Sequence, residues 1–317
     1  VAELAEPELR IAGLRINPNN FAQSRMVTIA GMKLKDINTL QEHSIAGLPE
    51  NMRATSLQWN PSQTKIAFVN LLPNRVDLYV VDIATFTATK INRLPLNIVS
   101  GGTFAWITDN SLLYKATVAS ALKPDKPHAP TGPVVQESLG KKAAARTYQD
   151  LIKSGYDEAL FEYYAKSQLV FTDFTTETSL GEPSIIKSFS LSPDNSYLLL
   201  QTIEKPFSYT VPAGEFPHTV KVTDLKGNLV RLIATNPSSE GVPIGFDDAP
   251  DYPRYFSWRN DEPATVTYIK ALDGGLGKSK SKWRDAMMAV KIDPANPATP
   301  AVELFKTTMR FAGVTWG

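Results

Sequence analysis

The chain has 317 residues, of which 43% are hydrophobic and 21% are charged, and its formal net charge is +1. Such a chain can bury a substantial core, and its balanced, interspersed charge argues against nucleic acid as a partner. It contains no cysteine, which excludes disulfide bonds, thiolate metal sites and a cysteine nucleophile. Its apolar runs fall far short of the roughly 20 residues of a membrane helix, so we expect no membrane span.

The first fifty residues predict short strands separated by turns. Residues 9–17, L-R-I-A-G-L-R-I-N, read as a strand that ends at Asn17-Pro18. Residues 26–29 and 32–34 predict a hairpin around Gly31. No complete four-stranded unit is expected before Trp59.

A strand–turn–strand pattern begins at residue 56 and recurs. Residues 56–69 read S-L-Q-W-N-P-S-Q-T-K-I-A-F-V, and residues 188–201 read S-F-S-L-S-P-D-N-S-Y-L-L-L-Q. In the second copy, the chain leaves the strand at Pro193, and Asp194 and Asn195 supply the side-chain hydrogen bonds or the left-handed backbone of a turn. Looser copies follow Trp106 and Trp258, and a truncated one ends at Trp316.

The anchors of this repeat are Trp59, Trp106, Leu191, Trp258 and Trp316. Trp59 and Trp106 are 47 residues apart, close to the roughly 40–50 residues of one four-stranded propeller blade. The sequence therefore predicts an all-β fold, an incomplete β-propeller with about five blades in residues 1–317. The clearest strands are expected at residues 66–70, 76–82, 88–91, 112–117, 169–174, 197–200, 219–224, 229–233, 286–292 and 302–305.

An insertion interrupts the pattern at residues 120–167. Its first part, 120–133, is rich in proline, which disfavours helices and central strands. Helical spacing of apolar residues follows in 147–165, where we expect one short helix ended by Gly155 and a second capped by Asp157. Insertions in repeat proteins collect on one face, which is often the binding face.

The sequence offers no catalytic motif. It lacks the Gly-x-Ser-x-Gly of a nucleophile elbow, and His43, His128 and His218 lack partners at metal-binding spacing, so no metal, cofactor or catalytic residue is expected. The string G-G-L-G-K-S at 274–279 resembles part of a phosphate-binding loop. Leu272 stands where that loop needs glycine, and the flanking strands predict a hairpin turn instead.

The best binding candidate is the loop at residues 205–218. Its aromatic rings offer stacking surface and its polar side chains offer hydrogen bonds; the candidate substrate-binding residues are Lys205, Phe207, Tyr209, Glu215, Phe216 and His218. A second interpretation is that these aromatic residues close the core between neighbouring blades.

Three segments carry a resemblance to a known family: A-G-L-R-I at 12–16, the helical stretch R-T-Y-Q-D-L-I-K-S-G-Y-D-E-A-L-F-E-Y-Y-A-K-S-Q-L-V at 146–170, and K-P-F-S-Y-T-V-P-A-G-E-F-P at 205–217. Essentially the whole chain resembles the amino-terminal propeller of the glutamyl endopeptidase group, the chloroplast enzyme and its bacterial relatives, within the prolyl oligopeptidase clan of serine peptidases. The resemblance implies a propeller that caps a carboxy-terminal α/β-hydrolase domain and restricts which peptides reach a Ser-Asp-His triad.

That resemblance also sets expectations about function. The implied partners are peptide substrates and the hydrolase domain, which we expect to lie outside this chain together with every catalytic residue. Relatives are expected to carry a basic residue where this chain has Glu215, so cleavage after glutamate is an open question. An exported or periplasmic location is implied by the family; the first ten residues show no secretory signal, and the start at Val1 suggests that an upstream part is missing.

A different class of function is a stand-alone propeller scaffold or peptide-binding module. The two interpretations differ in the edges of the ring, because a partial propeller exposes unpaired strands that can pair with another copy. Self-association through open blade edges is therefore expected for a partial propeller, and a closed monomer for a scaffold.

Overall fold

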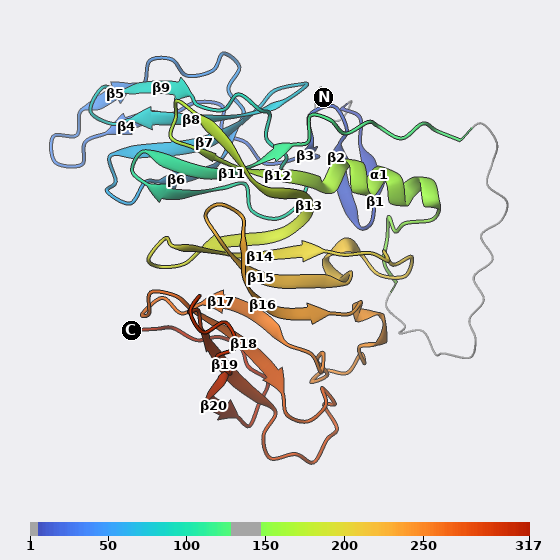
Figure 1. Ribbon diagram of the computed structural model, residues 1–317. Coiled ribbons are helices and arrows are strands. Elements are labelled where there is room, and N and C mark those ends of the chain that lie inside the picture. Colours follow the sequence, from blue (N-terminus) through green and yellow to red (C-terminus); the bar gives the residue numbers. More distant parts are fainter. Residues whose placement is uncertain (1–5, 128–146) are drawn as a thin grey trace. The chain divides into compact units, whose positions relative to one another are not determined.

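The computed structural model describes residues 6–127 and 147–317, and most of its regular structure is β-strand (Figure 1). The chain forms two compact units. Unit 1 comprises the described residues within Val1–Pro124 and Ala159–Ile185, and unit 2 those within Asp125–Glu158 and Ile186–Gly317. No helix of the described residues is long and apolar enough to cross a membrane.

Unit 1 begins with two small sheets. The first contains β1 (Leu9–Ile11), β2 (Leu14–Asn17) and β3 (Ala22–Gln23), and the second contains β4 (Lys33–Lys35) and β5 (Glu42–Ser44). The hairpin predicted around Gly31 is wrong, because Leu34 pairs with His43 and Ile29 forms an isolated bridge with Ala54. The backbone of Ile29 pairs with the next sheet, so residues 33–35 pair with the later strand β5 instead.

Unit 1 continues with a four-stranded antiparallel sheet and with the first part of a seven-stranded one. The first has the order β6 (Ala54–Trp59), β7 (Lys65–Leu71), β8 (Val76–Asp82), β9 (Thr87–Lys90). The second has the order β10 (Phe104–Thr108), β11 (Ser111–Thr117), β12 (Lys166–Thr172), β13 (Glu177–Leu191). The inner strands β7, β8 and β11 are buried along nearly their whole length, as expected for strands covered on both faces.

Unit 2 repeats this arrangement. The last residues of β13 belong to unit 2, where they neighbour β14 (Tyr197–Ile203), β15 (His218–Asp224) and β16 (Leu229–Asn236). A further sheet has the order β17 (Arg254–Trp258), β18 (Thr265–Ala271), β19 (Asp285–Lys291), β20 (Val302–Thr307). A core cluster in unit 2 joins these two sheets through Leu199, Val220, Val222, Trp258, Val266, Val290 and Ile292.

The predicted repeat anchors mark the first strands of these sheets. Trp59 ends β6, Trp106 lies in β10, Leu191 ends β13 and Trp258 ends β17. Two of the sheets, β6–β9 and β17–β20, have the four antiparallel strands of a propeller blade, and the predicted all-β, propeller-like fold is confirmed. Trp316 lies in a described segment without assigned secondary structure.

The turn at residues 192–196 shows why the repeat is readable from sequence. The Ser192 hydroxyl donates to Asp194 Oδ1 at 2.6 Å, and the backbone N–H of Ser196 donates to the same carboxylate at 3.0 Å. Asn195 has a φ of 54°, in the left-handed region that asparagine tolerates. Local side-chain chemistry thus fixes the hairpin between β13 and β14.

The insertion contains one described helix, α1 (Gly155–Ala165), and residues 147–154 are not helical. The short helix predicted before Gly155 is therefore wrong. The Ser154 hydroxyl accepts the N–H of Asp157 at 3.2 Å, and the Asp157 carboxylate accepts the N–H of Lys153 at 2.8 Å. This reciprocal capping starts the helix at Gly155 instead of ending one there. Residues 128–146, which include His128, lie outside the described residues.

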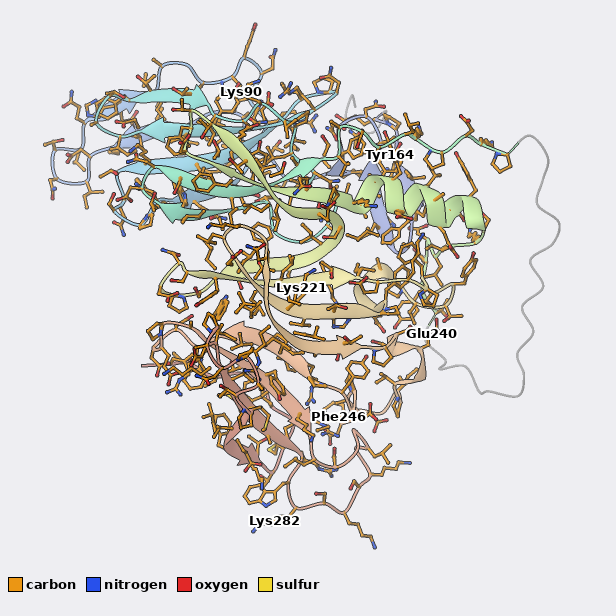
Figure 2. All side chains as sticks on the ribbon, viewed as in Figure 1. Lys90, Tyr164, Lys221, Glu240, Phe246 and Lys282 are labelled. Atoms are coloured by element: carbon orange, nitrogen blue, oxygen red, sulfur yellow. The ribbon has the colours of Figure 1, made fainter. Side chains whose placement is uncertain are left out.

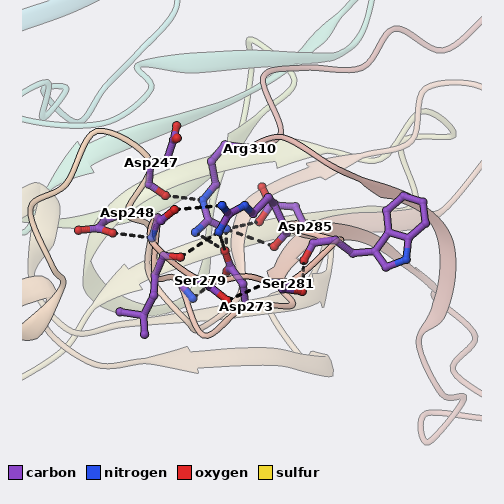
Figure 3. Close-up of polar contacts among 12 residues, drawn as sticks. Asp247, Asp248, Asp273, Ser279, Ser281, Asp285 and Arg310 are labelled. Atoms are coloured by element: carbon purple, nitrogen blue, oxygen red, sulfur yellow. Dashed lines mark hydrogen bonds and ion pairs between the residues drawn. The ribbon is translucent and has the colours of Figure 1, made fainter.

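The glycine-rich string at 274–279 lies in the connection between the antiparallel neighbours β18 and β19. Gly275 has a φ of 76°, and a Cβ there would lie 2.0 Å from the carbonyl oxygen of Ala249. This close approach requires glycine. Polar contacts to Asp273, Asp248 and Arg310 hold the connection in place (Figure 3).

Candidate functional site

A cleft of about 560 Å³ lies in unit 2 between the loop that joins β14 to β15 and the segment that follows β16. Figure 2 labels Glu240, which belongs to that second segment. The residues that line the cleft are Glu204, Lys205, Pro206, Phe207, Pro217, His218, Thr235, Asn236, Pro237, Ser238 and Glu240. Three of the six predicted binding residues are among them: Lys205, Phe207 and His218.

The loop is anchored at its base and filled by stacked rings. The N–H of Glu204 donates to the carbonyl oxygen of Pro217 at 2.8 Å. Phe207 and Phe216 are buried, and their ring centroids are 5.6 Å apart with nearly parallel planes. Phe216 is fully buried and is not among the residues that line the cleft, so it belongs to the core. Phe207 both packs against it and lines the cleft.

His218 begins β15 and lies directly opposite Asn236, the last residue of β16. Its Nδ1 is 3.1 Å from the carbonyl oxygen of Phe216, and its Nε2 is 3.1 Å from Asn236 Nδ2. A carbonyl oxygen can only accept and an amide nitrogen can only donate, so Nδ1 carries the hydrogen and Nε2 accepts. The geometry therefore defines a neutral imidazole with the hydrogen on Nδ1.

Asn236 connects this histidine to the next strand. Its amide nitrogen also donates to the carbonyl oxygen of Pro253 at 2.8 Å, which fixes the orientation of the side-chain amide. Its carbonyl oxygen Oδ1 then points away from both partners, and it has no hydrogen-bond partner among the described residues. The Asn236 residue is 2% exposed, so Oδ1 is a buried acceptor that lacks a donor.

Burial keeps the proton off His218. Desolvation is the largest cause that lowers the pKa of His218, and the positive charge of Lys187 lowers it further, whereas the Phe216 carbonyl raises it. Burial likewise lowers the pKa of Lys187, and the nearby Glu215 carboxylate opposes that shift. Lys187 Nζ donates to the carbonyl oxygen of Gly214 at 2.7 Å.

The other predicted residues, Tyr209 and Glu215, contact the insertion instead of the cleft. The hydroxyl of Tyr148 donates to Glu215 Oε1 at 3.0 Å. Tyr209 is a hydrogen-bond partner of Glu158, and this contact is the main reason that the pKa of Tyr209 rises to about 12. The loop is therefore held between the cleft on one side and the segment 147–158 on the other.

The sequence did not predict that Glu204, Asn236 and Glu240 would line the cleft as hydrogen-bond acceptors. Glu204 accepts a hydrogen bond at 2.7 Å from the Thr202 hydroxyl, and Glu240 follows the 3-10 helix start at Ser239. Asn236 and Glu240 are distant from the loop in sequence. The only local signal was the Asn236-Pro237 pair, which predicts the end of a strand. The register between β15 and β16 is what brings Asn236 to His218.

We expect acid to destabilise unit 2 through His218. Because its pKa is lower in the folded than in the unfolded chain, the folded state takes up its proton later, and stability falls as pH drops below 6.5 and through the folded pKa. Urea unfolding of the protein and of His218→Gln between pH 7.5 and pH 5 measures this, and the variant should show a smaller loss. The control is His43→Gln; equal pH dependence in all three proteins would contradict the expectation.

The fold and the cleft together define an all-β protein of blade-type sheets whose candidate site is a loop-lined binding cleft. No family model matches the chain. It is 32% identical to a probable glutamyl endopeptidase of Oryza sativa subsp. japonica over 100% of this chain and 35% of that protein. A probable glutamyl endopeptidase of Arabidopsis thaliana is also 32% identical, over 100% of this chain and 34% of that protein.

The chain is thus similar over its whole length to probable glutamyl endopeptidases, as its sequence predicted, and it spans about a third of the length of these relatives. Among solved structures, the β-propeller domain of the Trilobed protease from Pyrococcus furiosus matches 80% of this chain and 57% of that chain. The identity is 6% and the TM-score 0.41, so this likeness adds nothing to the description of the sheets.

Proposed function

We propose that this chain is a non-catalytic propeller portion of a serine peptidase, in which it helps to bind and admit peptide substrates. The observation that supports this most is the whole-length similarity to probable glutamyl endopeptidases, of which the chain spans about a third. The described residues contain a loop-lined cleft, and the sequence contains no nucleophile-elbow motif. Hydrolysis then belongs to a part of the peptidase beyond this chain.

The cleft and the insertion are the proposed contact region for peptides. Loop 205–218 lies between them, and its backbone is anchored at Glu204 and Pro217. Contacts from Tyr148 to Glu215 and from Glu158 to Tyr209 hold the loop against the insertion. A loop fixed on two sides presents a preorganised surface, which reduces the entropy lost when a peptide binds.

The test compares the peptidase activity of the longer protein with that of this chain. The substrates are peptides with glutamate or leucine before the scissile bond, together with a folded protein that contains the same cleavable sequence. We expect the longer protein to cleave the peptides but not the folded protein, and this chain to cleave neither. Peptidase activity in this chain, or equal cleavage of folded and short substrates by the longer protein, would refute the proposal.

A further inference from the structure

We propose that the cleft beside His218 binds a positively charged side chain of a peptide, with arginine as the preferred residue. The inference rests on the proposed function in taking a peptide as the ligand. Its physical basis is separate, because it follows from the hydrogen-bonding groups and the walls of the cleft. It assigns the cleft a ligand class that differs from the glutamate implied by the family resemblance.

The polar groups of the cleft are mainly acceptors. The carboxylates of Glu204 and Glu240 belong to its lining, and both residues are exposed. Asn236 also lines the cleft, but its unpaired Oδ1 is buried, so the two carboxylates are the acceptors that a ligand meets first. A ligand that brings several N–H donors and a positive charge complements these groups, whereas a carboxylate would be repelled.

The nitrogen groups of the cleft are already engaged. Both ring nitrogens of His218 are hydrogen-bonded inside the protein, and its lowered pKa keeps the ring neutral. Both hydrogens of the Asn236 amide are committed, to His218 and to Pro253. The ammonium of Lys205 lies 5.5 Å from the centroid of the Phe207 ring. His218 and Asn236 therefore have no hydrogen left to donate to an anion, and the two carboxylates of the lining outnumber its one ammonium.

The walls favour arginine over lysine. Three prolines, Pro206, Pro217 and Pro237, and the ring of Phe207 give the cleft mainly apolar sides. A guanidinium is planar, weakly hydrated and stacks on flat apolar surfaces, and its aliphatic stem can pack along the walls. Its five donors can reach more than one acceptor at once, which a single ammonium does less well.

Calorimetric titration of this chain with four capped pentapeptides tests the inference. The peptides are Ala-Ala-X-Ala-Ala with arginine, citrulline, leucine or glutamate at X. Citrulline keeps the shape of arginine but lacks its charge. We expect the arginine peptide to bind at least about fivefold more tightly than the citrulline peptide, and the glutamate peptide most weakly.

A double variant, Glu204→Gln with Glu240→Gln, should remove most of the arginine preference. We expect about a fivefold weaker affinity for the arginine peptide and little change for the leucine peptide. Both side chains are exposed, so folding should be retained, and an unchanged thermal unfolding midpoint verifies this. The matched control is Glu182→Gln, an exposed glutamate of β13 outside the cleft, which should bind as the parent does.

The outcomes separate this inference from the proposed function. Equal binding of the arginine and leucine peptides, or an arginine preference that survives the double variant, overturns the charge preference of the cleft while the chain still binds peptides. Failure to bind any of the four peptides also overturns it. The role within a peptidase is decided independently, by the activity comparison of the longer protein with this chain.

Discussion

Replacing Lys115 with methionine is expected to stabilise the protein by roughly 2–4 kcal/mol at pH 6, and by much less above pH 10. Lys115 lies on β11 of unit 1 and is 1% exposed. Its ammonium donates to the carbonyl oxygen of Ser100, and the described residues supply no ion pair for it. Methionine has a similar length and fills the same space without a buried charge.

The pH dependence follows from the protonation of this amine. Desolvation by burial lowers the pKa of Lys115 from 10.5 to about 7. Between pH 7 and pH 10.5 the unfolded chain holds the proton while the folded chain releases it, so this group makes the protein more stable as pH rises through that window. Below pH 7 the folded protein bears the full desolvation cost, and there the methionine variant gains most.

Urea unfolding at pH 6 and at pH 9 measures the effect on the free energy of unfolding. The matched control is Lys270→Met on β18, where the lysine is exposed and the change should stay within about 0.5 kcal/mol at both pH values. A Lys115→Met variant that is less stable than the parent at pH 6 would contradict the prediction. It would mean that the bond to Ser100 outweighs the cost of burying the charge.

The fold was predictable because the repeat contains turns that are defined by hydrogen bonds between neighbouring residues. The clearest copy of the repeat contains a turn whose side chains hydrogen-bond their own backbone, since Ser192 and Asp194 both accept the N–H of Ser196. The side-chain hydrogen bonds of this turn join residues within five positions of one another, so the local sequence is enough to predict it. Apolar periodicity was a poorer guide where two local signals competed. The spacing of Leu151 and Ile152 predicted a helix there, but the capping pair Ser154 and Asp157 makes the helix begin at Gly155.

The candidate site was predictable only in part, for the same reason. Lys205, Phe207 and His218 belong to one aromatic loop, so composition revealed them. Asn236 reaches the cleft through the pairing of β16 with β15, and Glu240 lies in the segment that follows β16. Pairing between strands is not encoded within either strand alone. The loop aromatics also served two purposes, since Phe216 is core while Phe207 is both core and cleft wall.

A buried charge network in unit 2 has no counterpart in any sequence motif. Arg310 lies between Asp273 and Asp285, with contacts of 2.9 Å to Asp273 Oδ1 and 3.2 Å to Asp285 Oδ1 (Figure 3). Arg284 donates to Asp273 Oδ2 at 2.8 Å, and Arg254 donates to Asp285 Oδ2 at 2.6 Å. The two carboxylates are almost fully buried. The network fastens the segment after β20 to the β18–β19 connection.

Replacing Asp273 with alanine is expected to destabilise unit 2 by roughly 3–5 kcal/mol, because Arg284 and Arg310 then lose a carboxylate partner while they remain largely buried. Burial by itself would raise the pKa of Asp273, but hydrogen bonds from Arg310 and Arg284 outweigh it and the net pKa is lowered. The contribution of this carboxylate is therefore present above pH 3.8 and is lost as pH falls through its folded pKa.

Urea unfolding of Asp273→Ala at pH 7 and at pH 3 measures this contribution, which should be smaller at pH 3. Asp261→Ala is the control. Asp261 also pairs with an arginine, Arg259, but it is exposed, so its loss should cost much less than the loss of Asp273. Asp273→Asn keeps the shape and some hydrogen bonds and should fall between the two. If Asp273→Ala costs no more than Asp261→Ala, the arginines must find other partners, and the network does not hold the β18–β19 connection.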